Sequence, residues 1–170
     1  MKILPILNSY FVRYKLQNNN KGVVIKHGFN AEFIENIIFK GTCYVGPNAY
    51  WSAKGGIEIG NNVIFGPRSI IWTYNHNYMS SEFIPYGGED ILGKVIIEDN
   101  VWIGINSIIL PNVTVGEGAI IGANTVVTKN VPKLAIVGGN PFRIIKYRDK
   151  DLYYKLKSEK KFYLNYKYNI

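Results

Sequence analysis

The segment WTYNHNY, residues 72–78, contains the side chain that is best suited to acid–base chemistry. His76 is one of two histidines among 170 residues. An imidazole titrates near neutral pH, so it can take up and return a proton under ordinary conditions. A lone histidine in a loop is more often solvated and idle. Whether His76 is an ordinary polar loop residue or the base of an enzyme therefore depends on the elements that position it.

A six-residue repeat dominates the chain around this segment. From Ile97 the sequence divides into IEDNVW, IGINSI, ILPNVT, VGEGAI, IGANTV and VTKNVP. The first position is always Ile or Val, and the fifth is a small or β-branched residue. The same pattern occurs upstream in IGNNVI, FGPRSI and IWTYNH, and more weakly in FKGTCY and VGPNAY. Neither helical periodicity nor simple alternation produces this pattern.

A period of six predicts short strands that coil into a parallel β-helix. The first and fifth positions should face the interior, and coils should stack about 4.8 Å apart, the usual spacing between strands. Glycines or polar residues after the aliphatic position should lie at corners, where positive φ or close approach favours glycine. The glycines at these corners are Gly60, Gly66, Gly104, Gly116 and Gly122. A stacked coil used only as a scaffold or binding surface would show the same repeat.

The repeat is interrupted once, by NHNYMSSEFIPYGGEDILGK at residues 75–94. This segment has no period and contains one proline and three glycines, so we expect a loop that leaves the coil wall. Long loops on rigid scaffolds often carry function. His76 would stand at the root of this loop, where the coil still holds it in place.

The remaining segments complete the predicted organisation. Residues 1–35 are expected to form an N-terminal cap, residues 36–147 the β-helix, and residues 148–170 a tail with a helix from about Asp149 to Lys161. The apolar N-terminal stretch is broken by Pro5 and Asn8 and is too short to span a bilayer. It also lacks a signal-peptide cleavage motif, and a chain with the single cysteine Cys43 fits a reducing cytoplasm.

The net charge of +8 suggests an anionic partner, such as nucleic acid, a membrane surface or a phosphorylated ligand. The Tyr- and Lys-rich tail could stack on nucleic acid. It contains no recognised nucleic-acid motif, however, and we expect a packing helix and no nucleic-acid partner.

Together, the hexapeptide repeats, the His-bearing loop, VWIGINSIILPNVTVGEGAIIGANTVVTKNVP and VGGNPFRIIK resemble the left-handed β-helix acyltransferases. The similarity covers about residues 57–146 and is greatest to the sugar O-acetyltransferases, including galactoside and maltose acetyltransferases and enzymes that modify bacterial surface polysaccharides. The resemblance implies an all-β, left-handed parallel β-helix, assembled as a homotrimer that binds acetyl-CoA between subunits.

The resemblance also implies roles for individual residues. His76 matches the catalytic histidine, and its neighbours Tyr74, Asn75 and Tyr78 are expected to contact the acceptor. Trp102 follows the inward Val101 and should point outward, where we expect it to line the CoA or acceptor site; packing between subunits alone would also explain its exposure. The residues expected along acetyl-CoA are Gly104, Gly122 and Ala123 at the pantetheine arm, with Thr128, Lys129, Arg143 and Lys146 at the adenine and phosphate end.

The chain departs from the family pattern in two places. Some sugar acetyltransferases carry an acidic pair before the coil that begins at Ile57, where this chain has YWSAKGG with Ala53 and Lys54. Asn48 and Glu82 are then the candidates for orienting the acceptor or the histidine. Many polysaccharide acetyltransferases also have two histidines in this loop. His27, in KHGF, lies outside the matched region, and two distant histidines do not suit a three-His zinc site, so we expect no metal.

Acetyl transfer from a thioester to a hydroxyl needs a base on the hydroxyl and donors for the oxyanion. The leading hypothesis is an acetyl-CoA-dependent O-acetyltransferase with His76 as base, acting on a sugar of a surface polysaccharide or its precursor. A lipid-linked precursor would favour contact of the basic surface with the inner membrane face. Alternatives are N-acetylation of an amino sugar or nucleotide-amino sugar, inactivation of an antibiotic, or a non-catalytic scaffold.

Overall fold

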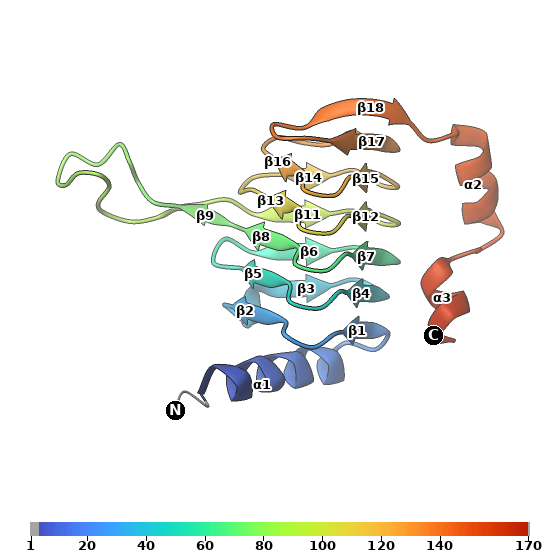
Figure 1. Ribbon diagram of the computed structural model, residues 1–170, viewed down its shortest axis with the longest axis horizontal. Coiled ribbons are helices and arrows are strands. Elements are labelled where there is room, and N and C mark those ends of the chain that lie inside the picture. Colours follow the sequence, from blue (N-terminus) through green and yellow to red (C-terminus); the bar gives the residue numbers. More distant parts are fainter. Residues whose placement is uncertain (1–3, 170) are drawn as a thin grey trace.

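The computed structural model describes residues 4–169, and its strands stack in three walls around one continuous core (Figure 1). Wall A contains β1 (Val23–Ile25), β4 (Cys43–Val45), β7 (Val63–Phe65), β12 (Trp102–Ile103), β15 (Ile120–Ile121), β17 (Ala135–Gly138) and β18 (Arg143–Tyr147). Wall B contains β2 (Asn30–Glu32), β5 (Tyr50–Ser52), β8 (Ile70–Trp72), β13 (Ile108–Ile109) and β16 (Val126–Val127). Wall C contains β3 (Ile37–Phe39), β6 (Ile57–Ile59), β11 (Val95–Ile97) and β14 (Thr114–Val115).

The chain visits the walls in the order A, B, C, and each strand pairs in parallel with the strand one coil earlier. The one antiparallel pair within the walls is β17 with β18, which closes the C-terminal end of wall A. The predicted left-handed parallel β-helix is therefore confirmed as the fold class.

The interior follows the six-residue repeat. All first-position residues are buried: Ile97, Ile103, Ile109, Val115, Ile121 and Val127. All fifth-position residues are buried as well: Val101, Ser107, Val113, Ala119, Thr125 and Val131. The expected small side chains at the fifth position fill the narrow interior, and a hydroxyl there finds a backbone acceptor, as Ser107 does on the carbonyl of Gly122 at 2.8 Å. Cys43 is buried in the same core.

The corners differ in part from the prediction. The corner glycines are required by the close approach of the backbone of the next coil: a Cβ on Gly104 would lie 2.7 Å from the backbone nitrogen of Ala123. Positive φ is adopted instead by asparagines in the corners, two residues after the glycine at three of them; they include Asn62, Asn100, Asn106 and Asn124. Asparagine tolerates the left-handed region because its short amide bonds locally. Here the amides also bond between coils, Asn62 to Asn100 at 2.8 Å.

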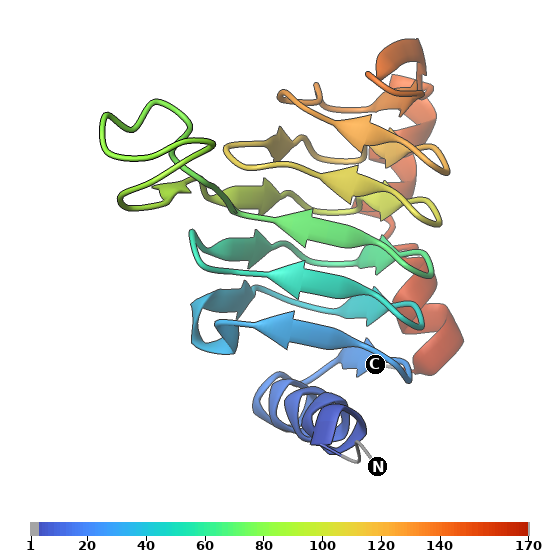
Figure 2. The ribbon, with the colours of Figure 1, turned by 60° about the vertical axis from the view of Figure 1, so that its left-hand side comes forward.

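The ends of the solenoid extend further than predicted. Strands begin at Val23, inside the segment expected to be a cap, and α1 (Leu4–Asn19) covers the first coil through the buried Val12 and Leu16. Figure 2 shows α1 lying across the open end of the solenoid. The predicted tail helix is α2 (Lys150–Ser158), shorter than expected, and a second helix, α3 (Tyr163–Tyr168), follows it along wall A.

Candidate active site

The predicted loop leaves the solenoid between walls B and C and projects far from the coils (Figures 1 and 2). Its root is a short antiparallel ribbon of β9 (Tyr74–Asn75) and β10 (Ile91–Leu92), in which Asn75 pairs with Ile91. His76 directly follows Asn75, and Asp90 directly precedes Ile91. The ribbon thus brings together two side chains that are 14 positions apart in sequence.

His76 makes a direct contact with this carboxylate. Its Nδ1 lies 2.8 Å from Oδ1 of Asp90, and Oδ2 of Asp90 accepts a hydrogen bond from Lys54 Nζ at 2.6 Å. Lys54, and secondarily His76, hold the pKa of Asp90 below its usual range. Because an ionised carboxylate only accepts hydrogen bonds, Nδ1 must carry the proton. The lone pair of neutral His76 is therefore on Nε2, where it can act as a base.

Aromatic rings and a backbone contact fix the imidazole on its other sides. Tyr86, from the far half of the loop, stacks on His76 with centroids 4.1 Å apart and planes 11° apart. Tyr74 meets the ring edge-on at 5.9 Å, and Asn75 Oδ1 accepts from the His76 backbone N–H at 3.0 Å. The His76 side chain nevertheless stays 47 % exposed. It is thus held in one orientation and remains open to a substrate.

The two residues expected to orient the acceptor or the histidine, Asn48 and Glu82, make no contact with His76. Glu82 is exposed in the loop, and its backbone N–H bonds to Ser80 Oγ at 3.1 Å. Asn48 lies before β5, at the corner between walls A and B, whereas the loop leaves at the corner between walls B and C. Tyr78 is 67 % exposed on the loop. The carboxylate that contacts the histidine is Asp90, so the expectation that Asn48 or Glu82 orients the histidine is wrong.

Sequence reasoning missed Asp90 and Tyr86 and noticed Lys54 only as a departure from the family pattern. Asp90 and Tyr86 lie in an aperiodic loop, where no repeat predicts which side chain returns to the solenoid. The sequence held one usable signal. Lys54 stands where some sugar acetyltransferases carry an acidic pair, and the loop contains the acidic segment GED at residues 88–90, with which a lysine could form an ion pair.

Trp102 lies on a different wall from His76. It points outward from β12, as predicted, and is 52 % exposed. A hollow of about 360 Å³ lies beside it, between wall A and the tail, and includes Tyr153, Phe162 and Tyr163. Figure 1 places β12 on the opposite side of the solenoid from the loop. One chain therefore does not bring Trp102 and His76 together.

The residues expected along acetyl-CoA fall into two groups. Gly104, Gly122 and Ala123 stack on one another at the corner between walls A and B. Thr128 and Lys129 follow β16, and Arg143 and Lys146 are exposed on β18, so these four gather near the C-terminal end of the solenoid. Lys129 Nζ lies 5.7 Å from the centre of the Phe142 ring.

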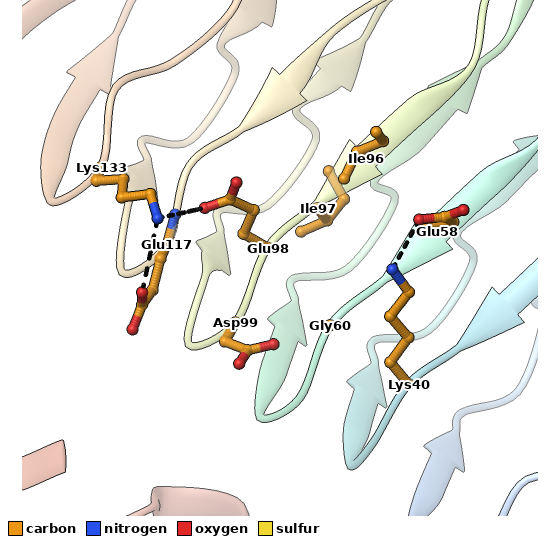
Figure 3. Close-up of a pocket in the computed structure, with 9 residues that line it drawn as sticks. All are labelled: Lys40, Glu58, Gly60, Ile96, Ile97, Glu98, Asp99, Glu117 and Lys133. Atoms are coloured by element: carbon orange, nitrogen blue, oxygen red, sulfur yellow. Dashed lines mark hydrogen bonds and ion pairs between the residues drawn. The ribbon is translucent and has the colours of Figure 1, made fainter. Parts of the chain in front are cut away.

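A separate polar hollow of about 260 Å³ lies along wall C (Figure 3). Its charges largely satisfy one another: Lys40 pairs with Glu58 at 2.8 Å, and Lys133 pairs with Glu98 at 3.4 Å. Lys94 also pairs with Glu58, and together the two lysines lower the pKa of that carboxyl to about 2. This hollow contains no histidine and is not the candidate site.

Within residues 4–169, no cluster of three or more His, Cys, Asp or Glu side chains could hold a metal ion. Over the same range, every helix is too short or too polar to cross a membrane.

Comparisons with known proteins agree with this architecture. Residues 94–129 match the family model described as bacterial transferase hexapeptide (six repeats). YvoF of Bacillus subtilis is 43 % identical over 101 residues, which cover 59 % of this chain and 53 % of YvoF. A galactoside O-acetyltransferase of Lactococcus lactis is 36 % identical over 107 residues, covering 63 % of this chain and 51 % of that enzyme. This chain thus spans about half the length of these two relatives.

A solved structure extends the similarity over most of the chain. The hexapeptide-repeat-containing acetyltransferase from Vibrio cholerae, in complex with acetyl coenzyme A, superposes with a TM-score of 0.68 at 32 % identity. The match covers 82 % of this chain and 79 % of the other. The fold and the loop-borne histidine define a β-helix protein with a candidate base, His76, at the root of its extruded loop. The chain belongs to the hexapeptide-repeat acetyltransferase family.

Proposed function

We propose that this protein transfers an acetyl group from acetyl-CoA to a sugar hydroxyl, with His76 as the general base. The observation that carries the proposal is the contact of His76 Nδ1 with Asp90 at the root of the loop. This contact leaves Nε2 free on a side chain that is exposed to solvent. Support for acetyl-CoA comes from the Vibrio relative, whose structure contains it.

The chemistry requires such a base. A sugar hydroxyl is a weak nucleophile at neutral pH, and the thioester is already activated, so no covalent enzyme intermediate is needed. Nε2 takes the hydroxyl proton as the oxygen attacks the carbonyl carbon. The imidazolium that forms is stabilised by Asp90, as in the triads of hydrolases. It returns the proton to the thiolate of CoA as the carbon–sulfur bond breaks. General base catalysis of this kind contributes roughly 10²–10⁴-fold.

We further propose that the complete site forms between copies of the chain, in a trimer. Trp102 and the corner glycines lie away from the loop of the same chain, so a neighbouring copy must supply them if they contact the same substrate. The loop carries exposed apolar side chains, Met79, Phe83 and Ile84 among them, and a loop of this kind suits contact with a second subunit. As acceptor we propose a sugar of a bacterial surface polysaccharide or its precursor.

The test is acceptor-dependent release of CoA thiol from acetyl-CoA, with methyl glycosides, amino sugars, nucleotide sugars and aminoglycoside antibiotics as acceptors. We expect His76→Ala to lose about a hundredfold or more in kcat/KM. His27→Ala removes the other histidine, which is exposed at a corner of the first coil, and should retain full activity. Equal activity of His76→Ala and the wild type would refute the base. Preference for amino sugars would redirect the proposal to N-acetylation.

A further inference from the structure

A row of aromatic rings runs from the outer face of wall B to the loop root and ends at His76. We call Tyr50, Trp72 and Tyr74 the aromatic row. Ring centroids are 5.9 Å apart between Tyr50 and Trp72 and 5.0 Å apart between Trp72 and Tyr74. The last member then meets the imidazole of His76 at 5.9 Å. The rings therefore form one continuous surface that leads to the candidate base.

The row is not needed to close the coil. Trp51 and Ile71, which alternate with the row on the same strands, fill the interior and are fully buried. In the parallel pairing of β5 with β8, Tyr50 lies beside Ile70 and Ser52 lies beside Trp72. Tyr50 and Trp72 are thus diagonal neighbours on the outer face, where each keeps part of its surface exposed. Aromatic side chains placed outward in this way offer flat apolar faces to a ligand.

A carboxylate stands at the far end of the row. Glu32 accepts hydrogen bonds from Tyr50 Oη at 2.9 Å and from Ser52 Oγ at 3.0 Å. Burial and the nearby Glu32 raise the pKa of Tyr50 to about 12, so its hydroxyl keeps its proton at neutral pH. Glu32 remains exposed and is held in one place. Its remaining lone pairs can accept hydrogen bonds from the hydroxyls of a ligand.

Flat apolar faces beside fixed hydrogen-bond acceptors match the chemistry of a saccharide. A pyranose ring has a face of C–H groups, which packs on an aromatic ring, and a rim of hydroxyls. The steps between centroids are close to the length of one sugar unit. A polyphosphate or nucleic acid fits less well, because the negative charge of Glu32 would repel it.

We infer that the aromatic row is an extended acceptor subsite, which binds the sugar units that precede or follow the unit acetylated at His76. The inference rests on the proposed function and makes it more specific: the preferred acceptor is an oligosaccharide or polysaccharide. The reacting sugar lies at His76, and the neighbouring units lie over Tyr74, Trp72 and Tyr50, with Glu32 at the far end.

The test compares acceptors of increasing length. Methyl glycosides of glucose, galactose and N-acetylglucosamine are assayed beside di- and trisaccharides of the same units, since a methyl group cannot imitate a second ring. We expect the wild type to favour the trisaccharide through a lower KM. Trp72→Leu should raise the KM for the trisaccharide about three- to tenfold, the loss expected for one aromatic contact, and change the monosaccharide values by less than about twofold. Glu32→Gln should act in the same direction.

Tyr44→Leu is the matched control, because Tyr44 is an outward aromatic residue on a strand of wall A and packs on Tyr168 at 5.9 Å. It should leave the preference for length unchanged. Thermal unfolding of each variant separates a loss of fold from a loss of binding. Calorimetric titration of the trisaccharide in the absence of acetyl-CoA tests the row independently of catalysis, and the conservative Tyr50→Phe serves there if Trp72→Leu does not fold.

Two results would overturn the inference while leaving the proposed function in place: acetylation of sugars with no preference for length, or equal losses in Trp72→Leu for short and long acceptors. A Trp72→Leu protein that dissociates in light scattering would instead identify the row as an interface between copies of the chain. Failure of the proposed function has a different signature, since the wild type would then release no thiol with any acceptor.

Discussion

Asp90→Asn is the sharpest perturbation of the candidate base, because it changes one oxygen and leaves the shape of the loop root intact. The Asp90 carboxylate accepts from both Lys54 and His76 Nδ1. An asparagine can instead donate a hydrogen bond from its NH₂ group to Nδ1, which must then be unprotonated. The imidazole would carry its proton on Nε2, and Nε2 could no longer accept the proton of the substrate hydroxyl. The carboxylate that stabilises the imidazolium would be lost as well.

The magnitude follows from how exposed the pair is. In a buried triad, the same substitution costs about 10⁴-fold in kcat. Here the Asp90 side chain is 18 % exposed and that of His76 is 47 % exposed, so water screens the pair and can replace part of the interaction. We therefore expect kcat/KM to fall by about 10- to 100-fold, less than the loss for His76→Ala.

The assay is thiol release under the conditions used for His76→Ala, with kcat and KM determined separately. The loss should appear mainly in kcat, because Asp90 acts through His76 and not on the substrate. Glu82→Gln is the matched control: it neutralises another carboxylate of the same loop, one without contact to His76, and should change kcat/KM by less than about twofold. Wild-type activity in Asp90→Asn, or an equal loss in Glu82→Gln, would refute the assignment of Asp90 as the positioning residue.

Three further predictions test the surroundings of the site and the solenoid. Lys54→Met removes the first of the two side chains that lower the pKa of Asp90, so the pKa of Asp90 should rise toward its ordinary value in an NMR titration, whereas Lys54→Arg should keep it low. Glu58→Gln should lower the Tm at pH 7, because a carboxyl whose pKa is depressed in the folded state stabilises the fold at pH values above its ordinary pKa of 4.5. The difference in Tm between Glu58→Gln and the wild type should shrink as the pH falls toward about 2, and an undiminished difference at pH 2 would contradict this. Ile103→Ala, in the fully buried first position of the repeat, should cost about 2–5 kcal/mol in urea unfolding, whereas Ile105→Ala, on the exposed corner of the same coil, should cost less than about 1 kcal/mol.

The solenoid was predictable because its information is local and repeated. Ile103 and Ile121 occupy a position that recurs every six residues, so their burial could be predicted, and both are fully buried. Strands β1 and β2 were not predicted because the segment that joins them keeps the spacing of six but not the residue types: Phe29 stands at the fifth position and Ala31 at the next first position, and both are buried. Helix α3 escaped because its position depends on long-range contacts, such as the bond from the Leu164 N–H to Asn62 Oδ1 at 3.4 Å.

The candidate site was predictable only where it belongs to the repeat. His76 follows directly from the end of a coil, so its position could be placed at the loop root. Its partners could not, because Lys54 and Asp90 come from separate segments 36 positions apart. An aperiodic loop of this length has many ways to return to the solenoid. The ribbon of β9 and β10 selects one of them, and no periodicity in the sequence encodes that choice.

The tail has a consequence for how the molecule unfolds. A stack of coils is nearly one-dimensional: each coil contacts its neighbours, and the ends of such arrays can fray independently. Tyr153 and Leu164 are buried in the tail, and they bond to Asn100 and Asn62 on two different coils. Since one continuous segment spans these coils, opening any of them strains its attachment to the others. The tail therefore couples these coils into one cooperative unit.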